Sequence, residues 1–312
     1  MAAKISVVMA SFNGIKYIRE QLDSIREQTL KPDEVIIRDD KSTDGTFEFC
    51  TEYISRNNLT GWRVSQNDSN LGVRKNFRLA LSMCTGEYIF TCDQDDVWMN
   101  DKIQVMSSVM AERPDSMCLA SNYIPVVNGE RINAKVRNIK RDDGSVIPFR
   151  LNDTWLDNMR PGCTYCFRRE LLDKFNVMDM EDQIHDSMLW KYAITSNSLY
   201  LINRLLILYR RHGDNATNQF NRTPPNITQR IANIDEESEM YKRFLDASDG
   251  LNIPESNQNL MKAKIDFLTR RRKILSKRNF FRTAMFVMVN FRYYPTARNA
   301  LSDIYASVFM RA

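Results

Sequence analysis

Four short apolar runs rich in β-forming residues lie within the first hundred residues, and a segment with helical periodicity follows each of them. The runs are "ISVVMAS", "EVIIRDD", "GWRVSQN" and "YIFTCDQDD". β-branched and aromatic residues bounded by turn residues predict buried strands. Strands that alternate with helices are joined by right-handed crossovers, which set the strands parallel in one sheet. We therefore predict an α/β, Rossmann-like fold with a mainly parallel sheet flanked by helices.

The helical segments and the later parts of the chain complete this prediction. Apolar residues three or four apart predict a helix after each run, the second of them over Thr46–Ser55. Further on, "GCTYCFRRELLDKF" predicts a strand then a helix, "IHDSMLWKYAI" a helix, and "LYLINRLLILYRRH" one or two strands, while "VNGERINAKVRNIKRDDGS" predicts a long polar loop. Beyond about Asn215 the pattern is helical. We predict one α/β domain over residues 1–217 and a helical extension over residues 218–312.

Polar residues stand where three of the predicted strands end. Ligands of parallel sheets bind beyond the carboxyl ends of the strands, so we expect these side chains to face one crevice. The residues are Ser11 and Asn13 after the first strand, Asp39 and Asp40 after the second, and Asp93, Asp95 and Asp96 after the fourth.

Three carboxylates within four residues repel one another, so they need a cation or open water around them. Oxygen ligands suit Mg²⁺ or Mn²⁺, which fill their remaining positions with water or substrate phosphates. On an extended backbone, Asp93 and Asp95 would point the same way, and Asp96 would face differently. A solvated acidic turn or a helix cap fits the motif alone equally well.

The ordered set "VVMASFN", "IIRDDKSTDGT", "NLGVRKNF" and "GEYIFTCDQDDVW" resembles the family 2 glycosyltransferases, which have the GT-A fold. With "HDSMLW" and "YRRHGDNAT" downstream, the resemblance points to the bacterial rhamnosyltransferase-like branch that builds cell-surface polysaccharides, and it covers roughly residues 5–217. It implies an inverting, metal-dependent transfer of a sugar from a nucleoside-diphosphate sugar, dTDP-rhamnose or a UDP-hexose. The implied acceptor is a growing, lipid-linked surface polysaccharide.

The resemblance also implies roles for individual residues. Asp186 matches the acid that takes the proton from the acceptor hydroxyl, a step that contributes about 10²–10⁴-fold. Taken without the resemblance, Asp186 would be a helix-start residue that interacts with the helix dipole. Asp93, Asp95 and His212 match the residues that hold Mn²⁺ or Mg²⁺. Donor binding is implied for Ala10, Ser11, Phe12, Asn13, Asp39, Asp40, Gly72, Arg74, Asn76, Asp93 and Asp96.

The net charge of +5 is distributed unevenly. From Lys262 onward the chain has twelve Lys or Arg and two acids, a net charge of +10, and the rest has a net charge of −5. Basic residues next to Phe, Met and Tyr in "TRRRKILSKRNFFRTAMFVMVNFRYY" favour a segment that lies on an anionic membrane surface. A hairpin packed on the catalytic domain and a homo-oligomer contact fit as well. No nucleic-acid motif accompanies the charge, so we expect no nucleic-acid partner.

The first residues and the cysteines indicate the cellular compartment, and other motifs bear on two alternative functions. The first residues lack a secretory apolar run and the six cysteines are scattered, so we expect reduced thiols and a cytoplasmic protein, peripheral on the inner face of the membrane. A sugar-phosphate nucleotidyltransferase would also place acids at strand ends, but "MASFNGIKYI" lacks its Gly-rich phosphate loop. A non-catalytic GT-A-like membrane scaffold is the other alternative, and the Asp93, Asp95 and Asp186 set argues against it.

Overall fold

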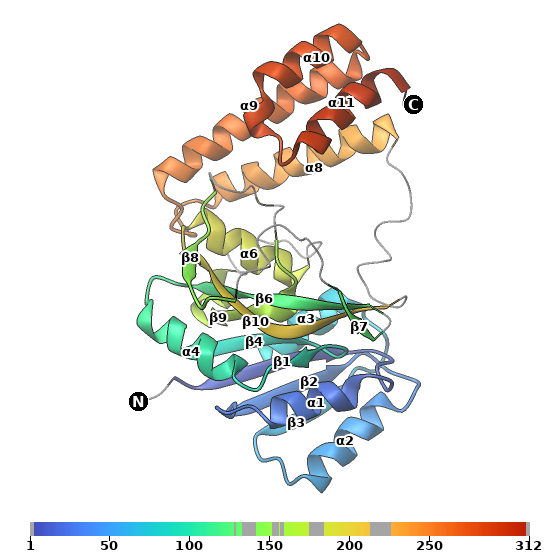
Figure 1. Cartoon of the computed structure of the whole chain (residues 1–312), viewed down its shortest axis with the longest axis vertical. Helices are drawn as coiled ribbons and strands as arrows, with labels where there is room; N and C mark the ends of the chain where they lie inside the picture. Colours follow the sequence, from blue (N-terminus) through green and yellow to red (C-terminus); the bar gives the residue numbers. More distant parts are fainter. Residues whose placement is uncertain are drawn as a thin grey trace. The chain divides into compact units, whose positions relative to one another are not determined.

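The computed structural model describes residues 3–127, 129–132, 142–151, 156, 159–174, 184–212 and 226–309. The chain divides into two compact units, which we call the sheet unit and the helical unit (Figure 1). The sheet unit comprises Met1–Phe149, Met159–Ile194 and Ser198–Ala216. The helical unit comprises Arg150–Asn158, Thr195–Asn197 and Thr217–Ala312.

One mixed sheet forms the sheet unit, with the strand order β3-β2-β1-β4-β9-β6-β10-β5, β7 paired to β6 and β8 paired to β10. The predicted parallel pairing holds for β3-β2-β1-β4 and for β6-β10, while β9 pairs antiparallel with both β4 and β6. The strands are β1 (Ile5–Ser11), β2 (Glu34–Asp39), β3 (Trp62–Gln66), β4 (Tyr88–Asp93), β5 (Val97–Trp98), β6 (Cys118–Val127), β7 (Glu130–Arg131), β8 (Val146–Pro148), β9 (Tyr165–Arg168) and β10 (Leu199–Arg211).

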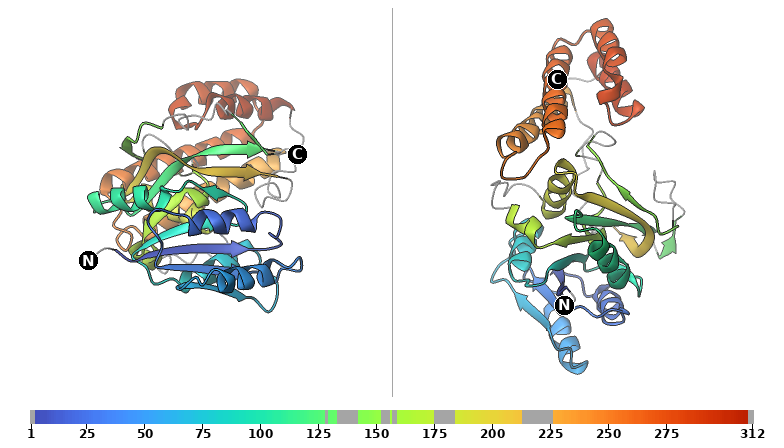
Figure 2. Two further views of the ribbon diagram at one scale, coloured as in Figure 1. Left: turned by 60° about the horizontal axis from the view of Figure 1, so that its bottom comes forward. Right: turned by 90° about the vertical axis from the view of Figure 1, so that its left-hand side faces the viewer.

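Helices cover both faces of this sheet (Figure 2). The chain passes from β1 to β2 to β3 in one direction, so right-handed crossovers put α1 and α2 on one face, and the return to β4 puts α3 on the other. Helix α6 shares the face of α3, since His185 at its start stacks on Phe77 of α3. The helices of this unit are α1 (Ile18–Arg26), α2 (Thr46–Arg56), α3 (Val73–Ser82), α4 (Lys102–Glu112), η1 (Gly162–Thr164), α5 (Glu170–Asp173) and α6 (His185–Thr195).

The elements predicted from periodicity are present. Each of the four apolar runs forms a strand, and "LYLINRLLILYRRH" forms the single strand β10. The apolar positions of α1, Ile18, Leu22 and Ile25, are buried against the sheet, as their spacing indicated. Residues 133–141 of the predicted polar loop lie outside the described residues. All six cysteines are buried and none forms a disulfide.

The helical unit contains α8 (Ile227–Asp246), α9 (Glu255–Ser276), α10 (Phe280–Val289), η3 (Phe291–Tyr293) and α11 (Ala297–Phe309). Helix α8 lies along α9, and α10 lies along α11 (Figure 1). Among the described residues, no helix has both the length and the apolar character needed to cross a bilayer.

A buried carboxylate joins three helices of this unit. Asp303 of α11 is fully buried and forms ion pairs with Arg230 of α8 (2.7 Å) and Arg271 of α9 (2.7 Å). The hydroxyl of Tyr294 donates a third hydrogen bond to it at 2.6 Å. Burial alone would raise the pKa of Asp303, but the hydrogen bonds and charges of these partners, Arg271 above all, lower it. The folded unit therefore holds Asp303 as a fully compensated anion.

We predict that Asp303→Asn destabilises the helical unit by about 3–5 kcal/mol, because it leaves two buried guanidinium groups without their counter-charge. Hydrogen exchange of α11 peptides in the full chain measures the loss of protection. Asp266→Asn is the matched control, since Asp266 forms an exposed ion pair with Arg270, and such a pair contributes only about 0.3–0.5 kcal/mol. Equal loss of protection in both variants would contradict the prediction.

Acid should reproduce the effect of the substitution in the wild-type chain. A carboxyl with a lower pKa in the folded state binds fewer protons there, so its stabilisation is complete above its unfolded pKa of about 3.9 and is lost as the pH falls below that value. Protection of α11 is expected to fall below about pH 4 in the wild type and to change less in Asp303→Asn.

Candidate active site

The acidic motif lies on a tight turn between β4 and β5. Strand β4 ends at Asp93, Gln94 and Asp95 form the turn, and β5 begins at Val97. The expectation of an extended backbone, with Asp93 and Asp95 pointing the same way, was therefore wrong, because the strand stops at its first acid. The turn instead brings Asp96 towards Asp93.

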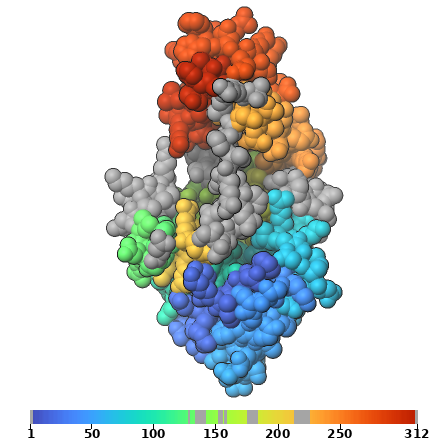
Figure 3. All heavy atoms as spheres, turned by 90° about the vertical axis from the view of Figure 1, so that its right-hand side faces the viewer, coloured from blue at the N-terminus to red at the C-terminus, as the bar shows by residue number. Residues whose placement is uncertain are grey.

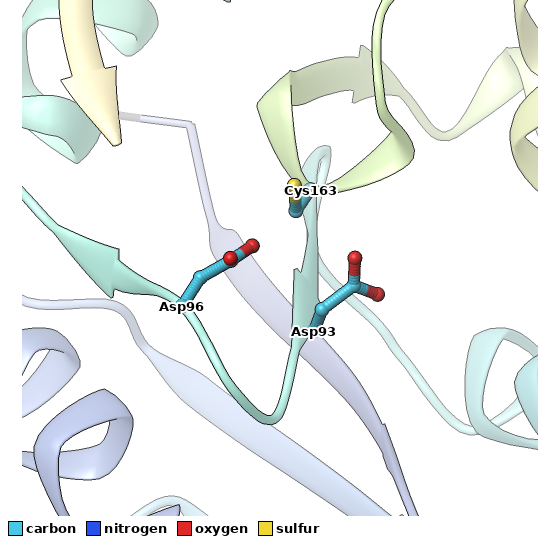
Figure 4. A group of neighbouring side chains, drawn as sticks. All are labelled: Asp93, Asp96 and Cys163. Atoms are coloured by element: carbon cyan, nitrogen blue, oxygen red, sulfur yellow. The ribbon is translucent and has the colours of Figure 1, made fainter. Parts of the chain in front are cut away.

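Asp93, Asp96 and the thiol of Cys163 face one another (Figure 4). One ligand atom from each lies within 4.8 Å of the others. Burial, followed by the charges of Asp95 and Asp186, raises the pKa of Asp93 to about 7. Burial and the charges of Asp93 and Asp95 raise the pKa of Asp96 well above its usual range. The turn thus gathers acidic groups in a buried site, where the charge of Lys102 offsets the effect of burial on Asp93 only in part.

The residues present fit a hard divalent cation. Asp96 Oδ1 accepts a hydrogen bond from the backbone N–H of Arg210 at 3.0 Å. Its Oδ2 is buried and has no hydrogen-bond partner among the described residues, and the Cys163 thiol lies beside the carboxylate. Burial and the two carboxylates raise the pKa of Cys163 well above its usual range, so it remains a thiol, and Mg²⁺ or Mn²⁺ prefers the oxygens. A cation here would satisfy an otherwise poorly compensated pair.

His212 and Asp95 lie together, as their shared assignment requires. His212 Nε2 is 2.7 Å from Asp95 Oδ2, and the imidazole stacks on the ring of Tyr17 with 4.6 Å between centroids. Beside His212 is a cleft of about 790 Å³ whose lining includes four Lys or Arg side chains. Its lining is Lys16, Tyr17, Glu20, Val126, Gly129, Arg131, Leu208, Arg210, Arg211 and His212.

Asp186 lies in the first turn of α6 and faces the same cluster, since its charge contributes to the raised pKa of Asp93. Gly162 fixes its position: a Cβ at residue 162 would lie 2.7 Å from the Cβ of Asp186. The preceding residue, His185, is buried, and its ring lies 3.6 Å from that of Phe77 between centroids. Burial lowers the pKa of His185 to about 4, so it is a neutral packing residue.

Asp39 is held by the loops at the ends of β1 and β2. It accepts hydrogen bonds from the hydroxyl of Ser11 (2.9 Å), the amide of Gln66 (2.9 Å) and both the backbone N–H and the hydroxyl of Ser42 (2.9 and 2.6 Å). Asn13 has a left-handed backbone (φ 48°), and its side chain accepts from the backbone N–H of Thr43. This part of the predicted donor set therefore forms one connected edge.

Asp40 shapes the loop that follows β3. It accepts from the side chain of Asn67 (2.7 Å) and from the backbone N–H groups of Leu71 and Gly72 (2.8 Å each). Asn67 also donates to Asn76, which in turn donates to the backbone of β2. The remaining predicted donor residues border this region: Ala10 and Arg74 are half-buried, and Phe12 is 44% exposed.

Sequence reasoning missed Gln94, Asn67 and Lys102. Gln94 forms two hydrogen bonds with the backbone of Phe12, one in each direction and both 2.9 Å long, which tie the acidic turn to the end of β1. Lys102 is completely buried, and its ammonium donates to the carbonyl of Cys163 (2.6 Å) and lies 3.7 Å from the centre of the Trp98 ring. Burial lowers the pKa of Lys102 to about 8. A lysine in the first turn of a helix, where the dipole disfavours a cation, was the available signal.

The chain is similar to proteins of one family, in sequence and in structure. The sequence model of the family described as "Glycosyl transferase family 2" matches residues 6–175. The dTDP-rhamnosyl transferase RfbG of Shigella flexneri is 32% identical over 219 residues, 66% of this chain and 72% of RfbG. The UDP-Glc:alpha-D-GlcNAc-diphosphoundecaprenol beta-1,3-glucosyltransferase WfgD of Escherichia coli is 26% identical over 205 residues, 64% of this chain and 73% of WfgD. The crystal structure of Staphylococcus aureus TarS 1–349 with UDP-GlcNAc has a TM-score of 0.62 at 19% identity, over 98% of this chain and 81% of TarS 1–349.

We predict that Gly14→Ala loosens the acidic turn, because a Cβ at residue 14 would lie 2.3 Å from Gln94 Oε1 and displace its two hydrogen bonds. Gly14→Ala and Gln94→Ala should each lower the free energy of unfolding by about 1–2 kcal/mol, measured by urea denaturation. In the Gln94→Ala background, Gly14→Ala should cost little more, since the clash is gone. Additive losses would show that the contact with Gln94 is not the cause.

Proposed function

The chain belongs to glycosyl transferase family 2 and has the GT-A fold, and from this premise we propose that it is an inverting, metal-dependent transferase that uses a nucleoside-diphosphate sugar. The observation that carries the proposal is the gathering of Asp93, Asp96 and Asp186 beside the carboxyl ends of β1, β2 and β4. Membership of this family makes the chain a glycosyltransferase and not a nucleotidyltransferase or a non-catalytic scaffold.

The donor would lie along the edge formed by the ends of β1, β2 and β4. The half-exposed ring of Phe12 offers an apolar contact for the base, next to the carboxylates of Asp39 and Asp40. Gly72, Arg74 and Asn76 border the loop that Asp40 organises, which suits them to the ribose and diphosphate. Ala10 and Phe12 have no polar side-chain group, which favours an apolar contact with the base at this end of β1.

Mn²⁺ or Mg²⁺ would be held by Asp93 and Asp95 with His212, and Asp96 would face the metal or the ribose. When bound, such an ion neutralises the charge of the departing nucleoside diphosphate. Burial and mutual repulsion raise the pKa values of Asp93 and Asp96, and a bound cation would favour their anionic forms. The bond between His212 and Asp95 orients that carboxylate from the side of β10.

Asp186 would remove the proton from the acceptor hydroxyl as the new bond forms. A sugar hydroxyl is a poor nucleophile, so a carboxylate in hydrogen-bond reach of it accelerates attack. The contact with Gly162 limits where the Asp186 carboxyl can lie. One carboxylate opposite the leaving group fits direct displacement, with inversion at the anomeric carbon. The backbone N–H of Ser187 donates to Asp186 Oδ1, and we propose that Oδ2 accepts the proton.

The acceptor and location are proposed from the relatives' names. RfbG is named as a dTDP-rhamnosyl transferase, and WfgD as acting on a sugar linked to diphosphoundecaprenol. These names support dTDP-rhamnose or a UDP-hexose as donor and a lipid-linked bacterial surface polysaccharide as acceptor. We assign the transfer to residues 1–217 and propose that the basic region 218–312 keeps the enzyme at the cytoplasmic face of the membrane.

We predict that one of the pyrimidine nucleotides UDP, dTDP and CDP binds with Mn²⁺ and binds far more weakly without it. Isothermal titration calorimetry measures this binding, with GDP as the purine comparison. Asp96→Asn and Asp95→Asn should weaken the metal-dependent binding by about 100-fold or more, since even partners of metal ligands contribute about 10–100-fold. Glu112→Gln, an exposed acid at the end of α4, is the control and should bind normally. Failure of every nucleotide to bind would remove the main support for the proposal.

We predict that Asp186→Asn lowers turnover by about 10²–10⁴-fold and leaves nucleotide binding intact, because it removes only the proton acceptor. Gly162→Ala should lower turnover by up to about 10²-fold, since its methyl group must push Asp186 aside. Release of the nucleoside diphosphate from the donor found by calorimetry measures both. A fully active Asp186→Asn variant would reject this residue as the base.

A further inference from the structure

The outer faces of α10 and α11 carry an unusual set of exposed apolar side chains. Phe281 is 81% exposed, Met288 78% and Phe309 67%. On each helix these residues recur at positions i, i+4, i+7 and i+8, which is the spacing of one helix face. The two stripes are Phe281, Met285, Met288 and Val289 on α10, and Leu301, Tyr305, Val308 and Phe309 on α11.

The core of the helical unit does not require these stripes. Helix α10 turns Thr283 and Val287 inward, and α11 turns inward Asp303 with its two arginine partners. Helices α10 and α11 run side by side, so both stripes lie on the same pair of packed helices (Figure 2). In the space-filling view of Figure 3, atoms of both helices, orange-red to red, reach the surface of the unit. Because the inner faces of α10 and α11 are buried within the helical unit, a partner would contact their outer faces.

The exposed charged residues of α10, α11 and the segments that flank them all have the same sign. Residues 267–309 contain nine Lys or Arg and a single acid, Asp303. Asp303 is fully buried and already paired. The exposed bases next to the stripes are Lys277, Arg278, Arg282, Arg292 and Arg298. Within residues 267–309, the face is therefore apolar in its centre, and its exposed charged side chains are all basic.

This combination selects among partners. Two copies of the chain pairing through the same face would bring the bases of residues 267–309 together, and this segment has no exposed acid to offset them. An anionic bilayer offers both complements: lipid headgroups for the bases and the acyl boundary for the apolar stripe. Hydrophobic patches of this kind, when rimmed by charge, mark sites of association.

We infer that the outer face of α10 and α11 is a docking surface for an anionic phospholipid bilayer. Phe281, Met288 and Phe309 enter the headgroup–acyl boundary, and the neighbouring bases contact the headgroups. The inference rests on the proposed function for its purpose, which is to bring the transferase to a lipid-linked acceptor. Docking itself requires no nucleotide, metal or turnover, so it can be tested independently.

The test is co-flotation of the full chain with vesicles of phosphatidylcholine alone and of phosphatidylcholine with 30 mol% phosphatidylglycerol, a proportion of about one anionic lipid in three. Wild type should partition about tenfold more strongly onto the anionic vesicles, and salt should weaken this partitioning. Phe281→Ser with Met288→Ser should reduce partitioning about tenfold. Leu30→Ser with Leu79→Ser, each about 40% exposed in the sheet unit, is the apolar control and should bind as wild type.

A charge variant tests the other half of the surface. Lys277→Gln, Arg282→Gln and Arg298→Gln together should lower partitioning about tenfold or more. Lys31→Gln, Arg56→Gln and Lys75→Gln together remove the same charge from exposed positions of the sheet unit and should leave partitioning unchanged.

Two results would overturn the inference. The first is equal or absent binding of wild type to the two vesicle types. The second is a wild-type dimer in light scattering that Phe281→Ser with Met288→Ser converts to monomer, which would make the face an interface between copies. Asp95→Asn should bind vesicles normally, so loss of the donor site and loss of docking are separable.

Discussion

The repulsion between carboxylates at the end of β4 is the interaction on which the sheet unit is organised. Asp93, Asp95 and Asp96 are held close together in a largely buried turn, and the two that face Cys163 have strongly raised pKa values. Such a group is costly unless something compensates it. The nearest buried cation, Lys102, instead donates to the carbonyl of Cys163. This incomplete compensation is the reason for which we propose a divalent cation at the turn.

Holding the turn in this state requires contacts from several strands. Gln94 ties it to the backbone of β1, the N–H of Arg210 ties Asp96 to β10, and His212 meets Asp95 from the end of β10. Glycines make two of the approaches possible: Gly14 leaves room for Gln94, and Gly162 leaves room for Asp186. The parallel arrangement of β1, β2 and β4 brings all these groups to one edge.

Elements whose structure depends on local residue pattern could be predicted from the sequence. Strand and helix periods placed the acids, Ser11 and Asn13 at strand ends, and the parallel sheet then brought them together. Local pattern could not show that the strand stops at Asp93, because that depends on Gln94 bonding to a segment 82 residues away. Lys102 was missed for a similar reason, since its burial depends on Trp98 and on the loop of Cys163. The tail was correctly predicted to be helical, but which face stays exposed depends on packing within the helical unit.

Two kinds of buried carboxylate distinguish stability from function in this chain. Asp303 and Asp96 are the same residue type and are equally buried. Burial raises the pKa of both, but the partners of Asp303 lower its pKa, whereas the charges of Asp93 and Asp95 raise that of Asp96 further. Asp303 has two arginines and a tyrosine hydroxyl, so it stabilises the fold as an anion. Asp96 has one backbone N–H and further carboxylates as neighbours, an arrangement that costs stability unless a cation binds. The contrast between these two buried acids supports the proposal that Asp96 belongs to a cation site, while Asp303 belongs to the packing of the helical unit.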